Sequence, residues 1–233
     1  MRRGPRYLPV AVAALLLGAV WLTLLGCGSA GPAPDPVTVL SGSTAKMKLI
    51  KGFHLVYEVH KPANAKPGTG LQIARITADV NADGNMQAVL DVTQSGVPLK
   101  LNFVQVGDNQ YLQMGAWQKI PVDSSPVGKL TLGASTVNIL QQVTQPTYVG
   151  RESKAGATCY HLTGSVPADA VRAIATSTTA TTPFPVDIWI GVKDSYVYEV
   201  DIKGAATADE PQGTSRSIIL SKHGVFVNIK API

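Results

Sequence analysis

Few side chains in this sequence stand at spacings that could do chemistry. Ser43 and Lys46 form a Ser-x-x-Lys motif, in which a lysine can activate a serine nucleophile. The Ser-Asp-Asn and Lys-Thr-Gly motifs that accompany this chemistry are absent, and no Gly-x-Ser-x-Gly, His-Glu-x-x-His or Walker motif occurs. The sequence therefore gives no basis for an enzyme, and we expect no catalytic residue.

Metal binding has an equally weak basis. The four histidines, His54, His60, His161 and His223, are scattered singly. His54 and His60 lie on one expected strand face but about 20 Å apart, too far to share an ion. Cys159 and His161 can face the same side of a strand, but no local motif supplies a third ligand. We therefore expect no metal and no cofactor, and we interpret Cys159 as a small buried apolar side chain.

Residues 1–26 have the composition of an export signal. Three arginines precede the uncharged stretch of residues 8–25, and small residues follow it. This pattern is typical of a secretory signal peptide. The placement of Cys27 directly after Leu-Leu-Gly resembles the lipoprotein box of bacteria, which implies cleavage before Cys27 and a diacylglyceryl thioether on its sulfur. An uncleaved signal anchor is the alternative.

Residues 27–35 consist mainly of small residues and proline, the composition of a flexible tether. No second apolar run of spanning length follows. We therefore expect residues 36–233 to form a single water-soluble domain, held by the lipid anchor on the extracytoplasmic face of the cell membrane, in the cell envelope.

Composition excludes two further classes of protein. Hydrophobic residues make up 45% of the chain and charged residues 15%, which is not the composition of a disordered chain. Of the 20 Lys and Arg, three lie in the signal segment, which leaves 17 against 15 Asp and Glu. A domain with nearly equal numbers of basic and acidic residues lacks the net positive charge that is typical of a nucleic-acid-binding protein.

From residue 53 onward apolar and polar residues alternate, the pattern of half-buried strands. Short turns such as Asp83-Gly84 join consecutive runs, which favours an antiparallel meander with one apolar face. The predicted strands are 53–60, 71–80, 86–93, 97–106, 110–114, 117–120, 146–154, 157–166, 186–192, 196–203, 214–221 and 224–230.

Three helices are expected beside this sheet, which makes the fold class α+β. Asp35 before Pro36 marks the start of the first helix, and Gly52 can end it. The second is predicted over 127–143 and the third over 165–176. The second is apolar on two sides, so it is either buried between the sheet and another helix or lies over the sheet with an apolar ligand on its other side.

Several motifs follow one another in a recognisable order. They are Cys27 with its tether and the first helix, the strand FHLVYEVH, Gly84-Asn85 before an apolar strand, Phe103 to Tyr111 with a Gly-Asp turn, Trp117, Val186 to Ile190, and Leu220 to Gly224 with Lys230 to Pro232. In this order and spacing, over most of residues 36–232, the sequence resembles the LppX/LprAFG (LprG-like) family of actinobacterial and mycobacterial lipoproteins.

The resemblance implies a strongly curved antiparallel half-barrel with helices on its concave face, enclosing an apolar cavity, as in LolA and LolB. It implies a monomeric protein that binds acyl chains of envelope lipids or lipoglycans and carries or presents them, with a membrane transporter as a candidate partner. The alternative is a noncatalytic envelope chaperone or interaction module that binds a partner protein.

Small side chains in the expected helices agree with unfilled volume beneath the sheet. Gly133, Ala134 and Ser135 lie in one helix, and Ala168 and Ala170 in the other. The same residues are equally typical of tight helix-on-sheet packing with no cavity. The candidate lipid-binding residues are Met86, Leu90, Leu99, Leu101, Phe103, Leu132, Ile139, Ile188, Ile190 and Val200.

Overall fold

The computed structural model describes residues 32–65, 70–122, 125, 132–172, 174–175, 178–208 and 210–233, with the backbone alone for 132–134. The signal segment, Cys27 and residues 127–131 therefore lie outside the described residues. Residues Pro34–Ile233 form one compact unit. Among the described residues, no helix has the length and apolarity needed to cross a bilayer.

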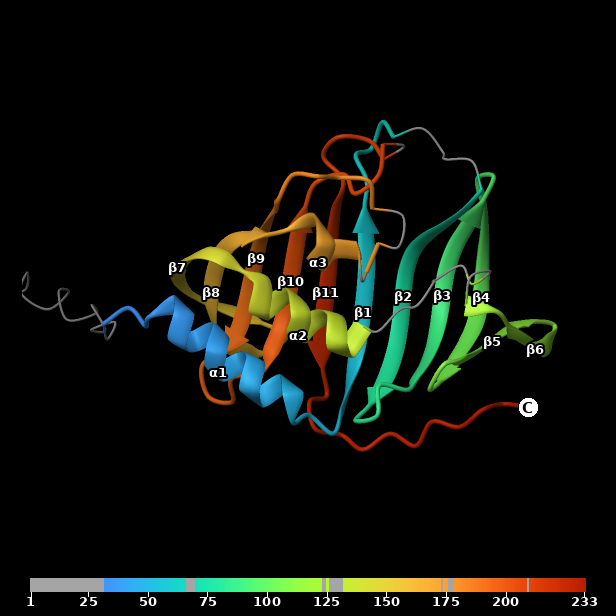
Figure 1. Cartoon of the computed structure of the whole chain (residues 1–233), viewed down its shortest axis with the longest axis horizontal. Coiled ribbons are helices and arrows are strands. Elements are labelled where there is room, and N and C mark those ends of the chain that lie inside the picture. The colour runs from blue at the N-terminus through green and yellow to red at the C-terminus, as the bar shows by residue number, and fades with distance from the viewer. Residues whose placement is uncertain are drawn as a thin grey trace, which may run out of the picture. The chain divides into compact units, whose positions relative to one another are not determined.

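Antiparallel strands form one sheet of eleven in the described part of the chain (Figure 1). The order along the sheet is β6-β5-β4-β3-β2-β1-β11-β10-β9-β8-β7, so two meanders are joined through β1 and β11. The strands are β1 Gly52–His60, β2 Leu71–Asn81, β3 Met86–Gln94, β4 Val97–Val106, β5 Asn109–Met114, β6 Ala116–Ile120, β7 Thr144–Lys154, β8 Ala157–Val166, β9 Phe184–Gly191, β10 Val197–Lys203 and β11 Ser215–Ser221.

The three predicted helices are α1 Pro36–Lys48, α2 Leu132–Gln142 and α3 Ala168–Arg172. The sheet is curved, and all three helices lie over its concave face (Figure 1). Asp35 caps α1, because its carboxylate accepts a hydrogen bond from the backbone N–H of Thr38 at 2.9 Å. The predicted α+β class, a curved antiparallel sheet with helices on its concave side, is confirmed.

The second helix, α2, packs against other elements on more than one side. It packs against α1 and α3, and Ile139 and Leu140 on it belong to the same buried cluster as the strands. Of the two explanations for its apolar faces, burial between the sheet and another helix agrees with these contacts.

The predicted C-terminal end of α1 is wrong. The helix ends at Lys48 with Leu49 as its C-cap, and Gly52 is instead the first residue of β1. A Cβ at Gly52 would clash with the carbonyl oxygen of Val225. Glycine is required here by the close approach of another backbone and does not end a helix.

The third helix is much shorter than predicted. Ser165 and Val166 remain in β8, where they pair with Pro185 and Phe184 of β9. The helix therefore begins only at Ala168, just after Pro167. Strand pairing outweighs the helix-start signal that the sequence carries before this proline.

A twelfth strand over 224–230 was predicted and is not formed. Lys222 and Gly224 have positive φ angles and turn the chain as expected, but β11 lies between β1 and β10 and has no free edge. The chain leaves the sheet after this turn, and Ile229 packs on the opposite face, against Val104 and Tyr111.

Candidate functional site

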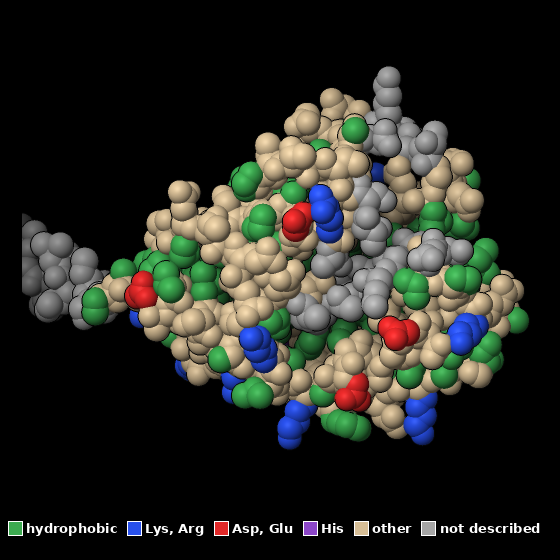
Figure 2. Space-filling model, in the orientation of Figure 1, with side chains coloured by type: hydrophobic (Ala, Val, Ile, Leu, Met, Phe, Trp, Pro, Cys, Tyr) green, Lys and Arg blue, Asp and Glu red, His purple; other side chains and the backbone are tan. Residues whose placement is uncertain are grey.

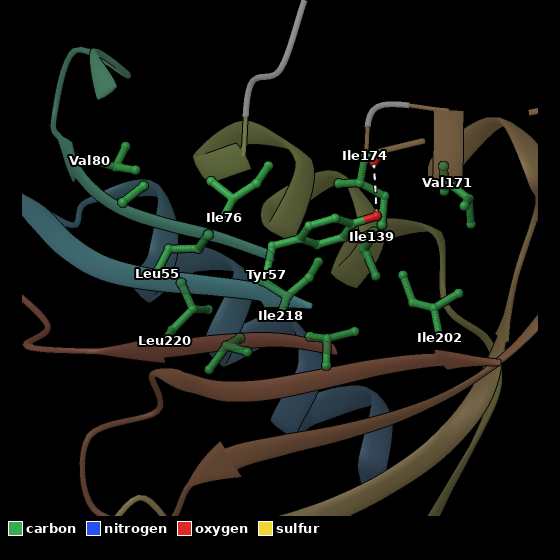
Figure 3. Packing of buried hydrophobic residues seen from close by; sticks show 14 of the residues in the cluster. Leu55, Tyr57, Ile76, Val80, Ile139, Val171, Ile174, Ile202, Ile218 and Leu220 are labelled. Atoms are coloured by element: carbon green, nitrogen blue, oxygen red, sulfur yellow. Dashed lines mark hydrogen bonds between the residues drawn. The ribbon is translucent and has the colours of Figure 1, made fainter. Parts of the chain in front are cut away.

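The candidate site is the apolar interior between the concave face of the sheet and the helices. At its centre, Leu55 and Tyr57 of β1 and Ile218 and Leu220 of β11 are buried. Figure 3 shows these side chains directed into one space, together with Ile139 of α2. The strand period places them there, because alternate residues of each strand face the same side.

Most of the predicted lipid-binding residues belong to this interior. Leu101 is only 7% exposed, whereas Leu99, on the same face of β4 but next to the β3–β4 turn, is 38% exposed. The side chain of Leu132 lies outside the described residues. The buried residues of the predicted set, all in one core cluster, are Met86, Leu90, Leu101, Phe103, Ile139, Ile188, Ile190 and Val200.

The strand residues of this set occupy two regions of the interior. Leu90 pairs directly with Leu101 across β3 and β4, and Ile188 pairs with Val200 across β9 and β10. β3 and β10 are four strand steps apart in the sheet order, which is about 19 Å at the usual strand spacing. The set therefore marks two regions of one elongated apolar surface.

The middle of that surface was missed by sequence reasoning. Leu55, Tyr57, Ile218 and Leu220 come from the two strands that join the meanders. Their alternation was visible in the sequence, but nothing local indicates that β1 pairs with β11. The one sequence signal that could have indicated these residues was the regular alternation of apolar and polar residues in the two strands.

One end of the interior carries hydrogen-bonding groups. Arg216, two residues before Ile218 on β11, is the one basic residue among the buried side chains of the described chain. Its guanidinium pairs with the carboxylate of Glu210 and donates to the carbonyl of Gly204 at 3.1 Å. Its Nε has no hydrogen-bond partner.

Tyr57 lies near this end. Its hydroxyl donates to the backbone carbonyl of Ile174 at 3.3 Å (Figure 3). Burial raises the pKa of Tyr57, and the nearby Arg216 opposes this only in part. The hydroxyl is therefore a neutral donor, and this end holds the one basic side chain that is buried in the described chain.

The residues of the Ser-x-x-Lys motif do not form a catalytic pair. Ser43 is buried and its hydroxyl has no hydrogen-bond partner. The ammonium of Lys46 lies 5.0 Å from the centroid of the ring of Tyr196. No activated serine results.

Cys159 and His161 face the same side of β8, as predicted, but they do not form a metal site. Among the described residues, no group of three His, Cys, Asp or Glu side chains could hold an ion. Burial raises the pKa of the Cys159 thiol to about 11. His161 instead lies between the carboxylates of Glu152 and Asp187, at 2.8 and 2.9 Å, and stacks on Trp189.

Comparisons with known proteins agree with this fold. The sequence profile of the LppX_LprAFG lipoprotein family matches residues 35–229. The chain is similar to the lipoarabinomannan carrier protein LprG of Mycolicibacterium smegmatis, with 29% identity over 259 residues, 100% of this chain and 99% of the relative. For the protein of the same name in Mycobacterium tuberculosis, identity is 26% over 249 residues, 99% and 97% of the two chains.

A solved structure extends the comparison. The crystal structure of LprF from Mycobacterium bovis superposes with a TM-score of 0.65 at 20% identity. The match covers 86% of this chain and 99% of LprF. At this identity the likeness establishes the fold.

Proposed function

Because the chain belongs to the LppX_LprAFG lipoprotein family, we propose that it carries acylated lipids or lipoglycans of the cell envelope, with their acyl chains bound against the concave face of the sheet. The observation that carries this proposal is the continuous apolar interior that runs from β4 to β9. Two relatives bear the name lipoarabinomannan carrier protein, which supports an acylated lipoglycan as ligand.

The energetics suit an exchange of lipid between protein and bilayer. An acyl chain of about fifteen methylenes gains on the order of 12 kcal/mol when it leaves water, at about 0.8 kcal/mol for each methylene. Between a bilayer and an apolar interior the same transfer is nearly neutral, because the chain is in hydrocarbon on both sides. Loading and release then need no large input of free energy.

The elongated shape of the apolar surface favours an extended ligand. We propose that the buried residues of the predicted set contact the acyl chains, and that the partly exposed Leu99 lies at the margin of this contact. Leu132 stays a prediction, because its side chain lies outside the described residues. We also propose that the acyl chains occupy a cavity within this interior.

We also propose that the carrier is noncatalytic and anchored at Cys27. Residues 1–26 would direct export, and residues 27–35 would tether the domain on the extracytoplasmic face of the membrane. The sequence before Cys27 and the lipoprotein family support this arrangement.

Native mass spectrometry of residues 28–233 tests the carrier function. This span contains the whole compact unit Pro34–Ile233. We expect co-purified lipid on the freshly isolated protein, and uptake of diacylglycerol or phosphatidylglycerol after the protein is stripped of lipid. A folded protein that carries no lipid and takes up neither compound would contradict the proposal and favour a module that binds a partner protein.

A further inference from the structure

Two large apolar side chains stand almost fully in solvent at one corner of the domain. Leu49, directly after α1, is 81% exposed, and Phe226, after the turn that ends β11, is 79% exposed. The two segments touch, because the backbone N–H of Gly224 donates to the carbonyl of Gly52 at 2.8 Å. Their apolar side chains therefore belong to one corner of the surface.

Exposed lysines are close to these side chains in the sequence. Lys48 and Lys51 flank Leu49, and Lys222 stands four residues before Phe226. In the described part of the chain, none of these three lysines forms an ion pair. Figure 2 shows basic and hydrophobic side chains along the lower edge of the molecule, with acidic side chains among them. We call these five residues, with the half-exposed Val225, the basic corner.

Acidic residues are scarce around the basic corner. The sequence has no Asp or Glu from 36 to 57 or from 211 to 233. On neighbouring elements, Asp79 is bonded to His54 and Asp194 to Tyr198. Asp83, in the turn after β2, lies at the same end of the sheet, since Asn81 pairs with Gly52. Asp108, in the turn after β4, lies at this end as well, because the backbone N–H of Gly107 donates to Asn85. The three lysines are nevertheless closer in the chain to Leu49 and Phe226 than any of these carboxylates.

We infer that the basic corner docks the domain on the surface of a bilayer containing anionic phospholipids. Large apolar side chains rimmed by lysines are the composition of a membrane-interface site, in which the apolar groups enter the acyl boundary and the ammonium groups meet phosphates. Each lysine near an anionic surface strengthens binding about 5-fold. We commit to a bilayer as the occupant because the family is one of lipoproteins and the proposed anchor at Cys27 would hold the domain at a membrane.

The basic corner can reach the same membrane as the proposed anchor. The helix α1 has 13 residues, so about 20 Å separates its first turn from Leu49. Residues 28–35 span at most about 28 Å when fully extended. The acyl chains on Cys27 and the basic corner can therefore contact one bilayer together, which would fix the orientation of the carrier on it.

Sedimentation with vesicles tests this inference. Residues 28–233, without the anchor, are mixed with vesicles of phosphatidylcholine alone or of phosphatidylcholine with phosphatidylglycerol. We expect the protein to pellet with the anionic vesicles and to be released by salt. Exchanging both Lys48 and Lys51 for Gln should weaken this binding about 25-fold.

The apolar side chains have a separate test. Exchanging both Leu49 and Phe226 for Ser should weaken vesicle binding at least about 10-fold. The matched controls are Met114→Ser and Lys119→Gln, which change an exposed apolar and an exposed basic side chain at the β5–β6 hairpin and should leave binding unchanged. In addition, the fluorescence of Phe226→Trp should shift to the blue on anionic vesicles, and that of Met114→Trp should not.

The outcome separates this inference from the carrier function. Lipid uptake leaves a loaded protein in the supernatant, whereas docking brings the protein into the pellet. Protein that takes up lipid but never pellets with anionic vesicles would overturn the docking surface and leave the carrier function standing. Pelleting that the variants at the basic corner do not reduce would overturn it equally.

Discussion

Tyr57 of β1 lies directly opposite Ile218 of β11 in the pairing that joins the two meanders of the sheet. Both side chains are buried in the concave interior. The two strands come from opposite ends of the domain sequence, so the contact closes a very long loop. The centre of the candidate site and the continuity of the sheet therefore depend on the same pair of strands.

Ile218→Ala should lower the free energy of unfolding by about 2 to 5 kcal/mol, because it removes buried methyl groups at a site that the rigid sheet cannot collapse around. Urea unfolding followed by circular dichroism measures this. Ile219→Ala is the matched control, since Ile219 points to the other face and is only partly buried. Equal losses in the two variants would show that Ile218 is not in the core.

The strands and their turns could be predicted because their signals are local. Alternation placed Phe53, Leu55 and Tyr57 on one face, and Gly84 occupies the positive φ angle that its turn requires. Each such feature depends on residues that are close in sequence. The curved sheet followed from the run of consecutive hairpins, together with the resemblance to a family.

Long-range packing was not predictable in the same way. The pairing of β1 with β11 leaves no free edge for residues 224–230, and the pairing of β8 with β9 shortens α3. The sequence of residues 224–230 does not show that β11 already has two neighbours, and the sequence around α3 does not show that β8 pairs with β9. The candidate site was for the same reason predicted at its two ends and missed at Tyr57 and Ile218.

Leu101→Trp should reduce lipid uptake several-fold while the domain stays folded. Leu101 is buried in the interior, so a larger ring there takes space that the proposal assigns to an acyl chain. A stability cost of about 1 to 3 kcal/mol is expected from overpacking. Native mass spectrometry gives the lipid bound per protein, and circular dichroism gives the fold.

Val97→Trp is the control for this variant. It places the same ring on the same strand face, four residues nearer the β3–β4 turn, at a position that is 58% exposed and outside the lipid-binding set. Uptake should stay close to that of the unchanged protein. Unaltered uptake in Leu101→Trp would remove Leu101 from the lipid-binding set.

The thiol of Cys159 should react very slowly in the folded protein. With a pKa raised by burial to about 11, its thiolate fraction near neutral pH is more than 100-fold below that of an ordinary cysteine. Cys159 is the one cysteine after Cys27, so iodoacetamide labelling of residues 28–233 reports on it alone. Labelling should become fast in urea.

A relocated thiol provides the comparison for Cys159. In a Cys159→Ala background, Thr158→Cys places the only thiol on an exposed position of the same strand. It should be labelled promptly in the folded protein. Equally fast labelling of the native Cys159 would contradict both its burial and its raised pKa.

His223 should make the domain less stable in mild acid. Its ring stacks on Tyr196 and meets the edge of Tyr198, and its Nε2 lies 2.7 Å from the carbonyl oxygen of Val197. Burial lowers the pKa of His223, against the opposing effects of that carbonyl and of Asp194. The unfolded chain then binds a proton more readily, so this contribution to stability is complete above the ordinary pKa of histidine and declines as the pH falls below it.

The effect of His223 is isolated by comparison with His223→Gln, which keeps a side-chain donor but cannot titrate. Urea unfolding of both proteins from about pH 7.5 to about pH 5.5 gives the difference in their free energies of unfolding. The contributions of the other histidines are the same in both proteins and cancel in this difference. The unchanged protein should lose more stability than the variant over this range. Parallel curves would mean that His223 titrates alike in the folded and unfolded chains, and that the two tyrosines do not shield it from water.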